Sequence, residues 1–188
     1  MSDLERRLDL IIRDSPTLMQ VLGRVRDLDL PDWLVFSGAV CQPVWNHLTG
    51  RPPDHGVKDY DLGYFDPDTS WDAEDAVISR VAAAFAAPLD RLVEVRNQAR
   101  VHLWFEQHFG EAYAPLASTA EALTRFVSPA FAVGVALRAD DSLLIAAPFG
   151  LEDLFAMRIR PNPLRASTNF RRIAQAIRSR WPEVAVEA

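Results

Sequence analysis

The sequence comprises 188 residues, of which 49% are hydrophobic and 24% are charged, with a formal net charge of −6. This length and apolar content predict one domain, residues 1–188, with a hydrophobic core of its own. The acidic balance argues against general binding to a nucleic-acid backbone, which depends on neutralising many phosphates. The single cysteine, Cys41, excludes an internal disulfide, and no apolar run approaches the roughly 20 residues that a membrane-spanning helix needs. We therefore expect a cytoplasmic protein without a membrane role.

Residues 1–28 are predicted to form an N-terminal pair of helices. Leu4, Leu8 and Ile11 recur at helical spacing, which indicates one amphipathic helix. Ser15 followed by a proline is typical of the cap and first turn of a second helix. The two helices are expected to pack against each other.

A strand, a tight turn and a helix are predicted in succession after this pair. Residues 33–36 form a short apolar run of β-prone side chains that stops at Ser37-Gly38. Apolar residues then recur at helical spacing until Gly50, which is typical of a helix end. Residues 51–57 contain two prolines and a glycine, so they are predicted to form a loop.

Two aspartates stand in the strand predicted over residues 59–66. Side chains two residues apart share one face of a strand, so Asp59 and Asp61 point the same way, whereas Tyr60 and Leu62 point to the other face. Neighbouring carboxylates repel each other unless a cation lies between them, and Mg²⁺ prefers oxygen ligands of this kind. The pair therefore favours a divalent metal site, with two solvated aspartates at a strand end as the alternative.

The rest of the chain continues the interleaving of helices and strands. The predicted elements are, in chain order, a helix opened by a capping box of Thr69 and Asp72, a strand over residues 92–95, a short helix capped by Ser118 with Glu121, a hairpin of residues 130–137 and 142–147, and a basic amphipathic helix over residues 167–181. Strands that alternate with helices, together with one hairpin, predict an α/β (α+β) fold in which a mixed β-sheet is packed with helices.

The C-terminal part of the chain is locally basic. Residues 154–182 contain seven arginines and no aspartate or glutamate: Arg158, Arg160, Arg165, Arg171, Arg172, Arg178 and Arg180. In the last helix Phe170, Ile173, Ile177 and Trp181 form one apolar stripe, which places several arginines on the other side. The basic surface is either a site that attracts anions or a solvated helix face.

A strand, the Ser37-Gly38 turn, a helix, a loop and an Asp-x-Asp pair on a second strand follow one another along the chain. This order resembles the nucleotidyltransferase superfamily related to DNA polymerase β. Further short blocks over residues 38–163 are similar to an uncharacterised bacterial branch of nucleotidyltransferase-like proteins. These blocks are Gly38-Ala39-Val40, Val44-Trp45, Leu48-Thr49-Gly50, Asp59-Tyr60-Asp61, Tyr64-Phe65-Asp66, Asn97-Gln98-Ala99-Arg100, His102, Pro148-Phe149-Gly150-Leu151 and Asp153-Leu154-Phe155.

The resemblance implies an enzyme that transfers a nucleoside monophosphate from a nucleoside triphosphate to a hydroxyl acceptor of unknown identity, with Mg²⁺ or Mn²⁺ as the metal. In this superfamily paired aspartates hold the metals, which assigns Asp59 and Asp61 as catalytic metal ligands. A third carboxylate lies on a neighbouring strand, where this sequence has Glu94. Asp90 is the alternative residue for that role. Glu94 itself is alternatively a structural acid that protects an edge strand.

The same resemblance assigns the nucleotide phosphates to Ser37, Gly38, Ala39, Lys58 and Arg100. A turn at a helix N-terminus binds phosphate through backbone N–H groups and the helix dipole, and Gly38 is expected in a turn that tolerates no side chain. Ala39 replaces the glycine or serine that is usual in the superfamily, so its backbone alone would act. Lys58 ends an unusually long loop and is either a phosphate clamp or part of a surface excursion. Arg100 either contacts the nucleotide or belongs to a polar group that caps helices.

Two other functions stay open from the sequence. A nucleotidyltransferase fold without turnover would serve as a nucleotide-binding, regulatory or antitoxin-like module. Ala39 favours this alternative, whereas the two crowded carboxylates favour an enzyme. Asp-x-Asp pairs also hold Mn²⁺ in nucleotide-sugar glycosyltransferases, but those catalytic domains are typically longer than this chain.

Overall fold

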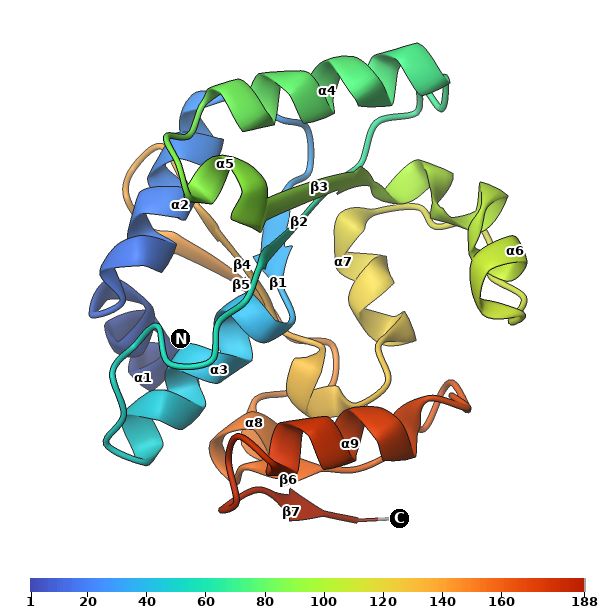
Figure 1. Cartoon of the computed structure of the whole chain (residues 1–188). Helices are drawn as coiled ribbons and strands as arrows, with labels where there is room; N and C mark the ends of the chain where they lie inside the picture. Colours follow the sequence, from blue (N-terminus) through green and yellow to red (C-terminus); the bar gives the residue numbers. More distant parts are fainter. Residues whose placement is uncertain (188) are drawn as a thin grey trace.

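The centre of the molecule is a five-stranded mixed sheet, seen in a computed structural model that describes residues 1–187 (Figure 1). The spatial order of the strands is β3-β2-β1-β4-β5, with β2 and β3 parallel and the other neighbours antiparallel. The strand bounds are Leu34–Phe36 for β1, Tyr60–Tyr64 for β2, Val93–Asn97 for β3, Gly134–Leu137 for β4 and Leu143–Ala146 for β5. The structure confirms the predicted mixed sheet packed with helices, including the hairpin of its last two strands.

Helices from the first half of the chain cover one face of this sheet (Figure 1). Their bounds are Asp3–Arg13 for α1, Pro16–Asp27 for α2, Gly38–Leu48 for α3, Trp71–Ala83 for α4 and Leu89–Leu92 for α5. The predicted N-terminal pair corresponds to α1 and α2, which contact each other, and α4 packs against β3. Within residues 1–187, no helix combines the length and the apolar character needed to cross a membrane.

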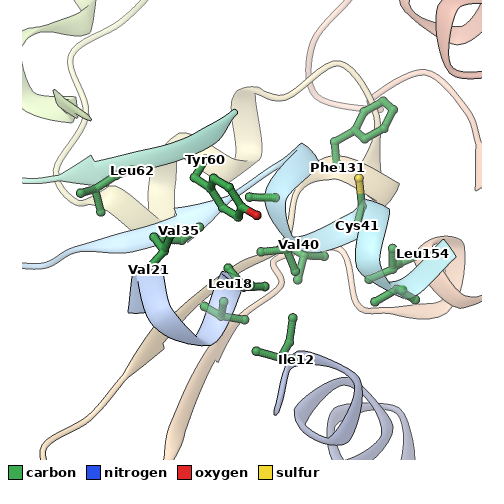
Figure 2. Close-up of a cluster of buried hydrophobic side chains, with 14 of the residues drawn as sticks. Ile12, Leu18, Val21, Val35, Val40, Cys41, Tyr60, Leu62, Phe131 and Leu154 are labelled. Atoms are coloured by element: carbon green, nitrogen blue, oxygen red, sulfur yellow. The ribbon is translucent and has the colours of Figure 1, made fainter. Parts of the chain in front are cut away.

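The main hydrophobic core lies between these helices and the sheet. Figure 2 shows Ile12 of α1, Leu18 of α2 and Val40 of α3 gathered near Val35 of β1 and Leu62 of β2. Each of these side chains is almost completely buried. Burial of an aliphatic side chain of this size contributes about 1.5–3 kcal/mol relative to leaving it exposed. The helices are therefore held to the sheet by packing rather than by polar contacts.

The alternation of β2 separates the core from the candidate site. Tyr60, Leu62 and Tyr64 are buried in the core, as their spacing predicts. Asp61 and Gly63 consequently face the opposite side of the sheet. The same alternation in β3 buries Val95 and leaves Glu94 exposed, so the two strands present their acids on the face away from the core.

Short helices cover the second face of the sheet only in part. Their bounds are Gln98–Leu103 for the 3₁₀-helix η1, Phe105–Phe109 for α6, Thr119–Ala122 for α7, Leu123–Arg125 for η2 and Pro129–Phe131 for η3. A smaller apolar cluster joins Leu34 and Phe36 of β1 to Leu123. This cover stops short of Asp61 and Glu94, where hollows open at the surface.

The C-terminal residues form a small layer below the sheet in Figure 1. Its elements are α8 (Glu152–Phe155), β6 (Arg158–Ile159), α9 (Phe170–Arg178) and β7 (Ala185–Val186), with β6 and β7 paired in parallel. The helix predicted over residues 167–181 is therefore present but shorter. Trp181 is fully buried beside Trp45 of α3, with ring centroids 5.7 Å apart, which ties this layer to the main core.

The arginines of residues 154–182 do not form one continuous basic surface. Asp153, just before this segment, accepts hydrogen bonds from the Nε atoms of Arg158 and Arg160 at 2.7 Å each. Arg165 forms an ion pair with Glu111. The exposed arginines of α9 are Arg171, Arg172 and Arg178. The basic helix face predicted from the sequence thus consists of these three side chains.

Several further element boundaries differ from the sequence predictions. The strand predicted over residues 59–66 comprises only Tyr60–Tyr64, and the first strand of the hairpin begins at Gly134 rather than at residue 130. The first turn of α4 is capped by Ser70, whose hydroxyl accepts a hydrogen bond from the Ala73 N–H at 3.3 Å, and not by Thr69. A serine and a threonine stand side by side here, so the local pattern alone does not distinguish them. β3 also continues to Asn97 because its pairing with β2 extends as far as Tyr64.

Candidate active site

A cleft of about 320 Å³ lies on the open face of the sheet, next to the start of α3. Ser37 and Gly38 belong to its wall, together with Asp59 and Asp61. The apolar part of the wall comes from η3, from α9 and from the segment between η2 and η3: Phe126, Val127, Phe131, Ile173 and Ile177. We call this cleft the first compartment. It brings the predicted phosphate-binding turn and the predicted metal ligands to one place.

A second compartment of about 180 Å³ adjoins the first. Four residues line both compartments: Asp61, Arg125, Phe126 and Arg165. Asp59 lines the first compartment, whereas Glu94 lines the second. Asp61 therefore stands at the junction, with one neighbouring carboxylate on each side.

Strand pairing places the three carboxylates close together. Asp61 is in register with Phe36 of β1 on one side and with Glu94 of β3 on the other. Because paired residues of neighbouring strands point to the same face, Asp61 and Glu94 lie side by side. Asp59 immediately precedes β2 and lies two residues from Asp61, so it reaches the same face.

The electrostatic environment of Asp61 opposes its negative charge. Burial raises the pKa of Asp61 to about 7, and the charges of Asp59 and Glu94 act in the same direction. A cation bound between these groups would remove this penalty. The three carboxylates are therefore better explained as the binding site of a positively charged ligand than as acids without a partner.

The turn before α3 is strained at Ser37. Its backbone has φ 61° and ψ −130°, a combination that residues with a side chain rarely adopt. The Ser37 N–H donates to the Val133 carbonyl at 3.3 Å, and the Ser37 carbonyl accepts from Val40 and Cys41 at 3.1 and 3.0 Å. These bonds hold the turn and leave the first N–H groups of α3 at the wall of the first compartment. Such a helix end binds anions.

The residue with positive φ in this turn is Ser37, not Gly38. A Cβ atom at Gly38 would meet the Nε2 atom of Gln42 at 2.7 Å. That contact involves the mobile end of a side chain, so a shift of Gln42 relieves it. The restriction at Gly38 therefore depends on Gln42, and the backbone restriction lies at Ser37.

Paired acids, a strained turn and a helix N-terminus thus share one cleft. A family model described as "Nucleotidyltransferase" matches residues 23–186. The chain belongs to the nucleotidyltransferase family. One solved structure, an NMR structure described as revealing a CCA-adding enzyme head domain, matches with a TM-score of 0.77 and 25% sequence identity. The match covers 97% of this chain and 95% of that chain. No curated protein matches the chain.

Two residues predicted to bind phosphate in this nucleotidyltransferase have side chains that do not line the first compartment. Ala39 is 1% exposed and packs in the main core, so its side chain does not face the first compartment. Its place in the first turn of α3 still leaves its N–H at the helix end. Lys58 is exposed beside Asp59 but is not part of the wall of either compartment.

Arg100 lies apart from the carboxylates. It is 6% exposed and forms an ion pair with Glu74 of α4, which is 5% exposed, at 3.4 Å. Its Nη1 atom also donates to the Ser70 carbonyl at 2.7 Å, and its guanidinium lies over the ring of Trp71. These contacts indicate that Arg100 has a structural role and holds the start of α4 in place. Asp90, the alternative third acid, likewise lies outside the walls of both compartments.

Asn46 positions the loop that carries Asp59, a role that no sequence pattern indicated. Its side chain is fully buried and donates to the carbonyls of Pro53 and His55 at 2.8 Å each. Its Oδ1 atom accepts from the indole N–H of Trp181 at 2.9 Å. One amide thus ties the loop between α3 and β2 to both α3 and the C-terminal layer.

Sequence patterns also did not reveal Gln42 and Arg125 as residues of the cleft. Gln42 is 7% exposed in the first compartment, and its Oε1 atom has no hydrogen-bond partner within residues 1–187. A buried polar atom without a partner is costly, so it favours a ligand or water at this place. The available signal was a glutamine among the otherwise apolar residues 39–45, one turn after Gly38. Arg125 lines both compartments, but no motif surrounds it.

The chemistry of the cleft fits a divalent metal held jointly with a nucleotide. Among residues 1–187, no three Asp, Glu, His or Cys side chains form a complete cation cage. Mg²⁺ commonly binds through one or two carboxylates and completes its shell with substrate phosphates and water. Asp59 and Asp61, with a helix N-terminus in the same compartment, provide such a partial set.

Proposed function

We propose that this nucleotidyltransferase is a metal-dependent enzyme that transfers a nucleoside monophosphate from a nucleoside triphosphate to a hydroxyl acceptor. The observation that carries this proposal is the position of Asp61 at the junction of the two compartments. The first compartment has an anion-binding helix end, and the second has a further carboxylate at Glu94. The family and the similarity to a CCA-adding enzyme head domain support the same class of reaction.

The triphosphate is assigned to the first compartment. Its negative oxygens would accept hydrogen bonds from the N–H groups at the start of α3, near Ser37 and Gly38. Asp59 and Asp61 would hold Mg²⁺ or Mn²⁺, which supplies neutralisation of the charge that develops on the phosphate oxygens. Gln42 would supply a polar contact to the nucleotide from the same helix.

The acceptor hydroxyl is assigned to the second compartment, beside Glu94. Its oxygen attacks the α-phosphorus and forms a new P–O bond, while the bond from the α-phosphorus to the oxygen that bridges to the β-phosphorus breaks. Pyrophosphate leaves, and the hydroxyl proton passes to the Glu94 carboxylate. Glu94 is exposed and close to Asp61, which suits an acid that must contact a bound molecule.

Pyrophosphate release tests the proposal. Wild-type protein would be mixed with Mg²⁺, each of the four nucleoside triphosphates and a panel of hydroxyl acceptors. Glu94→Gln and Asp61→Asn should each lower the rate by about 100-fold or more, because each removes a group that acts on the reacting atoms. Asp75→Asn, at an exposed position of α4, is the matched control and should keep the wild-type rate.

The test also separates the enzyme from the inactive nucleotide-binding alternative. Pyrophosphate release that depends on Asp61 and on an acceptor supports the enzyme. Tight, Asp61-dependent binding of a nucleoside triphosphate without release for any acceptor supports a regulatory or antitoxin-like module instead. Release that is equal in wild type and Asp61→Asn contradicts the assignment of the site.

A further inference from the structure

Aromatic rings form one side of the second compartment. Trp104, Phe105 and Tyr113 line it and are only half-buried. Phe105 lies 4.5 Å from Tyr113 and 6.0 Å from Trp104, measured between ring centroids. The fold therefore keeps a packed aromatic surface accessible beside the predicted third carboxylate.

Arginines also line this compartment. Arg165 lies 5.1 Å over the ring of Phe105 and is neutralised by Glu111. Arg125 makes a long contact of 3.9 Å with Glu121, and its Nε atom is buried without a hydrogen-bond partner within residues 1–187. The compartment thus contains a guanidinium whose Nε–H is not used by the described part of the protein.

Arg96 adds a charge with no acidic partner. It follows Glu94 by two residues on β3, so both side chains point to the open face of the sheet. Within residues 1–187 it forms no ion pair, and its Nη1 atom donates only to the carbonyl of Val95 at 2.7 Å. An unpaired arginine on an exposed strand usually serves only solubility. Arg96, however, lines the compartment that also contains the aromatic rings.

These side chains select one kind of ligand. Rings that stack and guanidinium groups that bind anions are the pair of features with which proteins hold nucleobases and phosphates. The volume of about 180 Å³ is small compared with the ~300–1,000 Å³ of common ligand pockets, so it admits one ring system with its substituents. Glu94 and Asp61 at its edge place a hydroxyl of that ligand next to the first compartment.

We propose that the second compartment binds the acceptor of the reaction and that this acceptor is an aromatic anion with a free hydroxyl, of the size of a single nucleotide. The assignment of this ligand as the acceptor rests on the proposed nucleotidyl transfer. Its binding does not, because Trp104 and Arg96 line the second compartment alone and are absent from the wall of the triphosphate site. Trp104 provides the stacking surface, and Arg96 with Arg125 binds the anionic group.

Equilibrium dialysis tests the proposal without measuring activity. The probes are the four nucleoside monophosphates, compared with the matching nucleosides and with ribose 5-phosphate. Inorganic triphosphate and Mg²⁺ are present to fill the phosphate site of the first compartment. At least one monophosphate should bind about tenfold or more tightly than its nucleoside and than ribose 5-phosphate, because only the monophosphate offers both an aromatic ring and an anion.

Two variants locate this binding, each with a matched control. Trp104→Leu and Arg96→Gln should each weaken monophosphate binding about fivefold or more, since each removes one of the two contacts. Trp71→Leu and Arg91→Gln change an exposed tryptophan and an exposed arginine outside both compartments and should leave binding unchanged. The affinity for inorganic triphosphate should be the same in all four variants.

A trinucleotide that ends in the preferred monophosphate identifies the source of the ligand. Tighter binding of the trinucleotide assigns the site to a chain terminus, and equal or weaker binding assigns it to a free nucleotide; both results support the proposal. Equal binding of ribose 5-phosphate and the monophosphates would overturn it, as would unchanged binding in both Trp104→Leu and Arg96→Gln. A failure of triphosphate to bind would instead count against the first compartment, and it is read in the same samples.

Discussion

Asn46→Ala perturbs the single buried amide that holds the loop before β2. The wild-type side chain donates to Pro53 and His55 and accepts from the indole N–H of Trp181. After truncation, the two loop carbonyls become partly hydrated because the loop lies at the surface, so each bond costs only its net value of about 0.5–1.5 kcal/mol. Trp181 is fully buried, and leaving its N–H without a partner costs about 1–3 kcal/mol.

The sum predicts that Asn46→Ala lowers the free energy of unfolding by about 2–6 kcal/mol. Urea denaturation followed by tryptophan fluorescence measures this loss, with an unchanged denaturant slope as the sign that the folded state keeps its compactness. Asn169→Ala is the matched control, because the Asn169 side chain is partly exposed and makes no cap hydrogen bond, and it should change the stability by less than about 0.5 kcal/mol. A loss below about 1 kcal/mol in Asn46→Ala would refute the role of this amide as the anchor of the loop.

Three further predictions address the turn, the buried ion pair and the basic helix face. Ser37→Gly should raise the free energy of unfolding by about 1 kcal/mol in thermal denaturation, because glycine adopts φ 61° without strain; a loss of stability would contradict the strain. Arg100→Met should lower the free energy of unfolding by about 3–5 kcal/mol, because it leaves the carboxylate of Glu74 buried without its cationic partner. The nucleotide affinity of the folded protein should be unchanged. A weaker affinity at unchanged stability would show instead that Arg100 belongs to the binding site. Replacement of all three exposed arginines of α9 by glutamine should raise the apparent Kd for nucleotide and flatten its salt dependence, because α9 borders the first compartment. An unchanged salt slope would show that these arginines form only a solvated helix face. The replaced residues are Arg171, Arg172 and Arg178.

The parts of the site that depend on local geometry were predictable from the sequence. The two-residue period of a strand already places Asp59 and Asp61 on one face, and the apolar runs around Ser37-Gly38 indicate a strand, a turn and a helix. The fold class followed from the order of such elements together with the family resemblance. These features require only neighbours within about ten residues along the chain.

Most of the features that the sequence did not reveal are non-local. Arg100 stands among polar residues that look available for a ligand, but its partner Glu74 lies 26 positions earlier and removes it from the site. Arg125 reaches the cleft only because η2 packs against β1 through Leu123. Asn46 meets Trp181 across 135 positions. Contacts of this kind depend on how elements pack, and no spacing rule along the chain reports them.

The central claim is that Asp59 and Asp61 bind a divalent metal together with a nucleoside triphosphate. Water-proton relaxation during a Mn²⁺ titration, with an equimolar mixture of the four nucleoside triphosphates present, measures this binding in wild type, in Asp61→Asn and in the control Asp75→Asn. We predict an affinity at least about tenfold lower in Asp61→Asn and unchanged in Asp75→Asn, because only Asp61 belongs to the proposed site. Equal Mn²⁺ affinity in wild type and Asp61→Asn would contradict the claim.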